Sequence, residues 1–285
     1  MVRFWSTLNK RMIYLQKLKI MKKRLLFLLG LITIISVSCK QSNVFQLTDL
    51  HIHLKGGFTI DDAIAKSAKD NIHYGIAVNC GLGFPIHSDS QIDSFLLVMK
   101  KYPQFYVGMQ AEGREWVNLF SKDSVKKFDY VFSDAMTFTD EKGRRNRIWI
   151  PAETWIDNEE QFMEYYVNTI VKIFNNEPIN IYVNPTYLPE PMVGRYKEFW
   201  TADRMNRVIE AAKKNNIAIE INNRYSIPSA DFIMKAKAAG IKFTVGTNNK
   251  DANFSAADYA KEMIKKCNLS EKDFWLPVTK NGVPQ

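Results

Sequence analysis

Two histidines are separated by one residue in the segment Asp49-Leu50-His51-Ile52-His53, and the whole chain contains only 4 histidines. Alternate residues of a β-strand point to the same side, so a strand here would present both imidazoles on one face. Neutral imidazole is the commonest protein ligand for divalent metals. The spacing predicts a pair of metal ligands, but an H-x-H alone is a weak signal that needs further ligands beside it.

Two glutamates are candidates for that wider site. Glu112 and Glu220 stand within or at the end of strand-like apolar runs, where an unpaired carboxylate is costly to bury. We expect at least one of them to be a metal ligand or a catalytic acid. The alternative is a structural salt bridge, for example to Lys55 or Arg224.

The elements that must position these residues alternate along the chain. Strand-like runs are expected at residues Phe45–Leu54, His73–Asn79, Phe105–Glu112, Tyr130–Asp134, Ile179–Val183, Ile217–Ile221 and Ile241–Gly246. Helical runs are expected at Ile60–Lys69, Gln91–Lys101, Glu115–Phe120 with Ser124–Lys127, Glu159–Phe174, Ala202–Asn215, Ala230–Ala239 and Ala256–Lys266. Apolar strands joined by helices indicate parallel pairing. The fold class predicted is α/β, a distorted TIM-like (β/α)7 barrel.

Polar residues follow every predicted strand. In a barrel of this kind the active site lies at the carboxyl ends of the strands. The polar residues at these ends are His51, His53, Asn79, Cys80, Glu112, Asp134, Asn184, Glu220, Asn222, Thr247, Asn248 and Asn249. The topology therefore brings together the histidines and the two glutamates, although loops are polar in any protein.

The net charge of +9 suggests at first a protein that binds nucleic acid. Residues 1–24, however, carry eight basic and no acidic residues. Subtracting these eight from +9 leaves +1 for the rest of the chain. A nearly neutral body gives no argument for binding a phosphate backbone, so no nucleic-acid partner is predicted.

The segment 21–39 has the pattern of a lipoprotein signal peptide. A basic stretch beginning at Met21 is followed by an uncharged apolar run, Leu25–Val37, and then by Ser38 and Cys39, and this apolar run is short for a membrane span. Cys39 is the predicted lipidation site, and a plain signal peptide or an uncleaved anchor is the alternative. Residues 1–20 are interpreted as a non-native upstream extension and residues 40–285 as one barrel domain. We expect an exported bacterial lipoprotein, periplasmic or at the cell surface, whose lipid anchors it to a membrane.

The chain resembles the PHP-domain (polymerase and histidinol phosphatase type) metal-dependent phosphoesterases, which belong to the wider amidohydrolase-like barrels. The resemblance covers roughly residues 47–267. It rests on the segments Asp49–His53, Gly108–Glu112, Phe128–Ser133, Ile219–Asn222 and Val245–Asn248. It implies a divalent metal, Zn, Mn or Fe, and hydrolysis of a small polar molecule, with a phosphate ester favoured.

The resemblance implies His51, His53 and Glu112 as metal ligands. This set has two nitrogens and one oxygen, as in catalytic zinc sites. Other histidines of the family are replaced here, for example by Asn184, so one metal is expected rather than three. The residues available to complete the site are Asp134, Cys80 and Glu220. Asp134 and Glu220 are also the candidates for the catalytic base, and Asp49 either orients an imidazole or caps its strand.

Further residues at the same strand ends are predicted to bind substrate. Lys55 follows the histidines in a glycine-rich turn, and Arg114 stands just past the third strand. Asn184 and Asn222 begin polar, aromatic loops and Asn248 follows the last strand. Each has a simpler interpretation: an exposed lysine, packing at a helix start, or turn chemistry.

A basic run at residues 139–147, with two tryptophans nearby, is either a substrate lid or a solvated surface.

Taken together, these features of the sequence predict an exported metal-dependent hydrolase acting on a small-molecule substrate. One alternative is a catalytically inactive barrel that binds a sugar or an anionic ligand, and another is a metal-dependent lyase or aldolase-type enzyme of related barrels. The sequence does not predict the oligomeric state.

Overall fold

Seven parallel strands close into a barrel in the computed structural model, which describes residues 45–278. The strands are β1 (Leu47–Ile52), β2 (Ile72–Cys80), β3 (Tyr106–Ala111), β4 (Tyr130–Ser133), β7 (Ile181–Tyr182), β8 (Ala218–Asn222) and β9 (Phe243–Gly246). They pair in chain order, and β9 pairs with β1 through Asp49 and Val245. The predicted (β/α)7 barrel is confirmed. The predicted extension, signal peptide and lipidation site, residues 1–39, lie outside the described residues.

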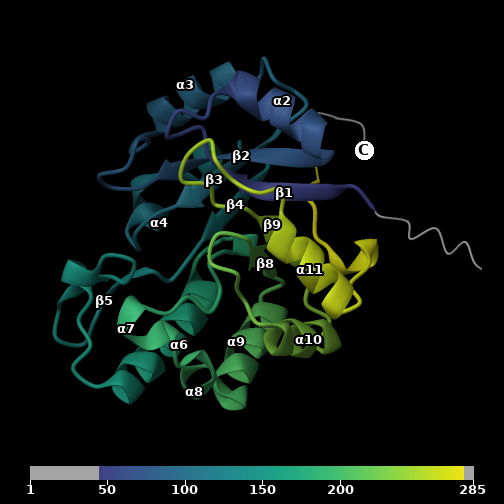
Figure 1. The fold of residues 1–285 in the computed structure, drawn as a ribbon. Coiled ribbons are helices and arrows are strands. Elements are labelled where there is room, and N and C mark those ends of the chain that lie inside the picture. The colour runs from purple at the N-terminus through teal and green to yellow at the C-terminus, as the bar shows by residue number, and fades with distance from the viewer. Residues whose placement is uncertain (1–44, 279–285) are drawn as a thin grey trace, which may run out of the picture. The chain divides into compact units, whose positions relative to one another are not determined.

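Helices follow the strands and surround the barrel (Figure 1). They are α2 (Ile60–Asp70), α3 (Asp89–Met99), α4 (Trp116–Leu119), α5 (Lys122–Val125), α6 (Glu159–Asn176), α7 (Glu190–Val193), α8 (Tyr196–Phe199), α9 (Ala202–Lys214), α10 (Ala230–Ala238) and α11 (Asp258–Lys266), with 3₁₀ turns at Pro151–Glu153 and Glu271–Asp273. The start of α2 shows why such helices begin where they do. Thr59 and Asp62 form a reciprocal capping box that satisfies amide groups of the first turn.

The inside of the barrel is filled by side chains. This inner cluster consists of Leu50, Ala77, Tyr130, Phe132, Ile181, Val183 and Ala218. The Tyr130 hydroxyl donates a hydrogen bond of 2.6 Å to the carbonyl oxygen of Leu50, so the one polar atom on that large ring is satisfied. A second, larger core packs between the strands and the helices. The barrel is therefore a rigid support for residues at its rim.

The basic run at residues 139–147 belongs to an antiparallel hairpin of β5 (Thr137–Thr139) and β6 (Arg145–Arg147). Its charges are neutralised locally. Arg144 pairs with Asp140 and Asp157 at 2.7 Å each, and Arg147 pairs with Glu153. The structure supports the solvated surface rather than a charged lid.

Two smaller observations complete the fold. Cys80 and Cys267 are buried free thiols, so the disulfide that two cysteines would permit is not formed. Among the described residues, we find no helix with the length and apolar character needed to cross a membrane.

Candidate functional site

Asp49 fixes the rim of the barrel where the first and last strands meet. Its Oδ1 accepts hydrogen bonds of 3.0 Å from the backbone N–H groups of His51 and Thr247, and its Oδ2 accepts one from the Thr247 hydroxyl. Burial raises the pKa of this carboxyl to about 6, against the lowering effect of these donors. Asp49 therefore locks β1 against β9 and does not touch an imidazole.

His51 is held by a buried carboxylate. Its Nδ1 lies 2.6 Å from Oε1 of Glu220, and both residues are 1 % exposed. The other oxygen, Oε2, accepts hydrogen bonds from the backbone N–H of Asn184 at 2.7 Å and from Nδ2 of Asn222 at 2.9 Å. Both oxygens of Glu220 are thus engaged in positioning neighbouring groups. The structure gives this residue the geometry of a support for His51.

The glutamate fits only because residue 246 is a glycine. A Cβ at Gly246 would collide with the carboxylate of Glu220 on the neighbouring strand. The close approach of backbone and carboxylate explains why the last strand ends in this residue.

His53 is oriented differently. Its Nδ1 donates a 2.9 Å hydrogen bond to the carbonyl oxygen of Ala77, so Nε2 carries the lone pair of the neutral ring. Burial, reinforced by positive charge at His51 and Lys55, lowers the pKa of His53 well below its usual value. Within residues 45–278, Nε2 of His53 is buried and has no hydrogen-bond partner. This unpaired atom requires an explanation.

A polar cavity of about 210 Å³ lies at the carboxyl ends of the strands. Its lining consists of Lys55, Asn79, Phe84, Gln110, Glu112, Asp134, Met136, Trp149, Asn184, Arg224, Tyr225 and Asn248. Five predicted site residues meet there: Lys55, Glu112, Asp134, Asn184 and Asn248. Gln110 also lines the cavity, although the sequence did not predict it as a site residue. Strand alternation was its only signal, because it stands two residues before Glu112.

Two carboxylates face this cavity in different environments. Oε1 of Glu112 accepts a 2.6 Å hydrogen bond from Nδ2 of Asn79, and burial followed by the nearby charge of Asp134 raises the pKa of Glu112 to about 8. Asp134 accepts hydrogen bonds from the backbone N–H of Met136 at 2.9 Å and from Nδ2 of Asn184 at 2.8 Å. Burial raises its pKa and those donors oppose the rise. Burial and the neighbouring charge of Asp134 thus both favour the protonated form of Glu112.

Two cations lie on the same cavity. Neither Lys55 nor Arg224 has a carboxylate within 4.0 Å in the described part of the chain. The pKa of Lys55 is lowered by partial burial and by the like charge of Arg224, against the attraction of Glu112. The Arg224 guanidinium lies 5.1 Å from the centre of the Tyr225 ring. The two positive groups thus lie on one edge of the cavity.

Two predicted substrate contacts do not line this cavity. Arg114 forms an ion pair of 2.9 Å with Glu177 and donates a 2.8 Å hydrogen bond to the Ser133 hydroxyl. Asn222 lies behind the lining and donates to Asn184 Oδ1 at 3.0 Å. The structure gives Arg114 and Asn222 packing and positioning roles.

The predicted metal ligands are not assembled into a three-residue set. The rings of His51 and His53 are 5.1 Å apart between centroids. Glu112 is hydrogen-bonded to Asn79 instead. Across residues 45–278, no group of three or more His, Cys, Asp or Glu side chains is arranged to hold a metal ion. Because an amide, Gln110, is the polar group beside His51 Nε2 at 3.3 Å, the donor set does not fit a catalytic zinc site.

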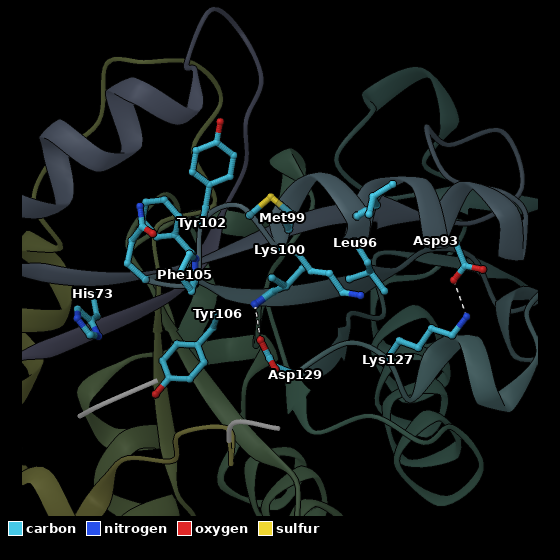
Figure 2. Close-up of a pocket in the computed structure, with 14 residues that line it drawn as sticks. His73, Asp93, Leu96, Met99, Lys100, Tyr102, Phe105, Tyr106, Lys127 and Asp129 are labelled. Carbon is cyan, nitrogen blue, oxygen red and sulfur yellow. Dashed lines mark hydrogen bonds and ion pairs between the residues drawn. The ribbon is translucent and has the colours of Figure 1, made fainter. Parts of the chain in front are cut away.

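A larger cavity of about 850 Å³ lies at the opposite, amino-terminal ends of β2 and β3. Figure 2 shows its lining, in which the aromatic side chains Tyr102 and Phe105 lie at one end of the cavity and the ion pair of Lys127 with Asp93 lies at the other. Active sites of α/β barrels lie at the carboxyl ends of the strands. The smaller polar cavity is therefore the candidate active site.

The fold defines a class, the distorted (β/α)7 barrels. The particular similarity is to the crystal structure of histidinol phosphate phosphatase from Lactococcus lactis subsp. lactis Il1403, solved with zinc, L-histidinol and phosphate. The two chains are 14% identical, the match covers 79% of this chain and 95% of that one, and the TM-score is 0.54. At this identity the similarity shows the fold, and the predicted resemblance to PHP-type barrels is confirmed at that level.

A weaker similarity joins this chain to a chain in the cryo-EM structure of archaeal ribonuclease P with mature tRNA. It has 12% identity, covers 84% of this chain and 99% of that one, and has a TM-score of 0.37, too low to support any conclusion. No protein-family model matches the sequence, and no curated protein matches it.

Proposed function

We propose that the polar cavity is the active site of a hydrolase acting on a small anionic molecule, with a phosphate ester as the favoured substrate class. One observation carries this proposal. The cavity combines two buried carboxylates, Glu112 and Asp134, with two cations, Lys55 and Arg224, that have no ion-pair partner among the described residues. Acid–base groups and an anion-binding edge thus face one space, on a barrel similar to that of a phosphatase.

In this proposal each residue has a separate task. Lys55 and Arg224 hold the anionic group of the substrate. Protonated Glu112 gives its proton to the leaving oxygen as the phosphorus–oxygen ester bond breaks. Ionised Asp134 accepts a proton from the water whose oxygen bonds to phosphorus. Asn184 holds Asp134 in place through its amide and links it to the buried network behind the cavity.

The predicted divalent metal has no step in this proposal. The similar phosphatase was solved with zinc, and a metal was expected here on the same resemblance. The donors in this chain do not fit such a site, as described above, so the reaction is assigned only to residues that line the cavity.

A second candidate is a barrel that binds a sugar or anion without catalysis. The observation favouring it is the mixture of amides with the aromatic side chains Phe84, Trp149 and Tyr225 around the cavity. Aromatic faces with neighbouring hydrogen-bonding groups suit a polyhydroxylated ligand.

The two candidates separate in one set of measurements on the purified full chain. Hydrolysis of p-nitrophenyl phosphate and a panel of phosphomonoesters is measured for the parent and for Lys55→Met, Arg224→Met, Glu112→Gln and Asp134→Asn. We expect each cation variant to raise KM about tenfold, because each removes one charge-assisted contact of about 1.4 kcal/mol or more. The carboxylate variants should lower kcat at least about a hundredfold. Lys69→Met, an exposed change on α2, is the matched control.

One possible result is that no ester in the panel is hydrolysed, while the parent binds inorganic phosphate and the two cation variants do not. That result would favour the binding barrel. If phosphate does not bind and no ester is hydrolysed, both candidates fail.

We also propose that the chain is exported and anchored through Cys39. The sequence pattern of residues 21–39 is the support for this. Mass spectrometry of the amino terminus from a bacterial host tests it. A diacylglyceryl-modified Cys39 is expected, and an unmodified Cys39 contradicts the anchor.

A further inference from the structure

His51, the first histidine of the H-x-H motif, has a neighbour that the sequence did not predict. Oε1 of Gln110 lies 3.3 Å from Nε2 of His51. Gln110 is 7 % exposed and lies on β3, opposite Asn79 of β2. This amide therefore lies beside the ring nitrogen that His51 would use to bind a metal.

The Nδ1 atoms of both rings already have polar partners. Nδ1 of His51 faces Glu220 at 2.6 Å, and Nδ1 of His53 donates to Ala77 at 2.9 Å. Such contacts to a carboxylate or carbonyl are those that fix the orientation of metal-ligating histidines. The Nε2 atom of His51 faces Gln110 at 3.3 Å, and the Nε2 atom of His53 is buried with no hydrogen-bond partner among the described residues. The contacts that would orient two metal-binding histidines are thus present, and a third ligand is not.

We propose that the Gln110 amide takes the place of a metal ion beside His51 and His53, so that the barrel holds them as a metal-free cluster. An amide side chain is neutral and carries both donor and acceptor atoms, and its oxygen and nitrogen exchange positions by a simple flip. It can therefore satisfy an imidazole nitrogen in either protonation state. A carboxylate at position 110 supplies the anionic third ligand, and Gln110→Glu converts the cluster into a two-histidine, one-carboxylate metal site. This inference does not depend on the proposed hydrolysis.

Zinc content tests the proposal directly. The full chain and its variants are stripped with chelator, incubated with excess Zn²⁺, passed through a desalting column and measured by mass spectrometry of the metal. We expect the parent to retain no more zinc than its His53→Ala variant. Gln110→Glu should retain about one zinc per chain, at least about tenfold more than the parent. That zinc should be lost again in the Gln110→Glu, His53→Ala double variant.

Thermal unfolding gives a second readout that needs no activity. Without metal, Gln110→Glu buries an uncompensated charge and should melt below the parent. Zinc should raise its Tm by several degrees and leave the Tm of the parent unchanged, because a ligand stabilises only the state that binds it. If Gln110→Glu does not fold, the zinc content of the parent still tests the proposal. One zinc per parent chain that disappears in His51→Ala or His53→Ala overturns the proposal.

Discussion

Glu112→Gln should make the protein less sensitive to alkaline pH. The pKa of Glu112 is raised from 4.5 to about 8 by burial and by the charge of Asp134. A carboxyl with a raised folded-state pKa stabilises the fold fully only below its unfolded value. That contribution is lost as the pH rises from 4.5 to about 8, where the buried group must ionise. Each pH unit in this window costs about 1.4 kcal/mol of unfolding free energy.

The structure sets the size of the effect. The range from about pH 5 to pH 8 lies between the unfolded and folded pKa values of Glu112. The unfolding free energy of the parent should therefore fall by on the order of 4 kcal/mol between pH 5 and pH 9 through this group alone. Glutamine has the shape of protonated glutamate and keeps an oxygen for the Asn79 donor. The variant should therefore match the parent near pH 5 and exceed it by about 4 kcal/mol at pH 9. Its removal of a negative neighbour also eases ionisation of Asp134, which adds in the same direction.

Urea unfolding at pH 5, 7 and 9 measures the difference. Glu262→Gln, an exposed change on α11, is the control and should follow the parent at every pH. Parallel pH profiles for Glu112→Gln and the parent would mean that Glu112 is already ionised in the folded protein. The assignment of Glu112 as the proton donor would then fail together with the stability prediction.

Two further changes test the rim. Gly246→Ala should lower the unfolding free energy by about 2–3 kcal/mol, because the new Cβ displaces the buried Glu220 carboxylate; Gly194→Ala, where a Cβ meets nothing within 4 Å, is the control in the same urea titration. Asp49→Ala should cost about 2–4 kcal/mol, since it leaves the N–H groups that closed β1 onto β9 without their acceptor, including that of Thr247. A loss below about 1 kcal/mol in either variant would contradict the packing described for it.

The barrel itself could be predicted from the sequence because each strand is an apolar run and each long helix an amphipathic one. Thr59 with Asp62 marks the start of the first helix correctly. The hairpin of β5 and β6 was not predicted. Its strands are three residues each and polar, so they carry neither hydrophobic alternation nor length.

The candidate site was predicted in part. Placing polar residues at strand ends found Glu112, Asp134 and Lys55, because parallel strands bring their carboxyl ends to one rim. The sequence could not show which of the polar residues at the strand ends contact one another or the histidines. Whether Glu220 or Gln110 faces the histidines depends on strand register and on side-chain rotamers, and neither can be determined from one sequence.

Two asparagines at the strand ends, Asn184 and Asn248, have a physical role of their own. Asn184 donates to Asp134, its oxygen accepts from Asn222 and Asn248, and its backbone N–H donates to Glu220. Asn184 and Asn248 both adopt left-handed backbone conformations, with φ of 48° and 49°, which asparagine tolerates better than most residues.

A continuous chain of buried hydrogen bonds therefore runs from a cavity carboxylate, Asp134, through Asn184 and Glu220 to His51. A fully satisfied buried network is rigid, because breaking any member leaves another polar group unpaired. The amides thus give the rim a fixed geometry that metal coordination would otherwise impose. In the proposed reaction, Asp134 is thus held in place by the same network that orients His51.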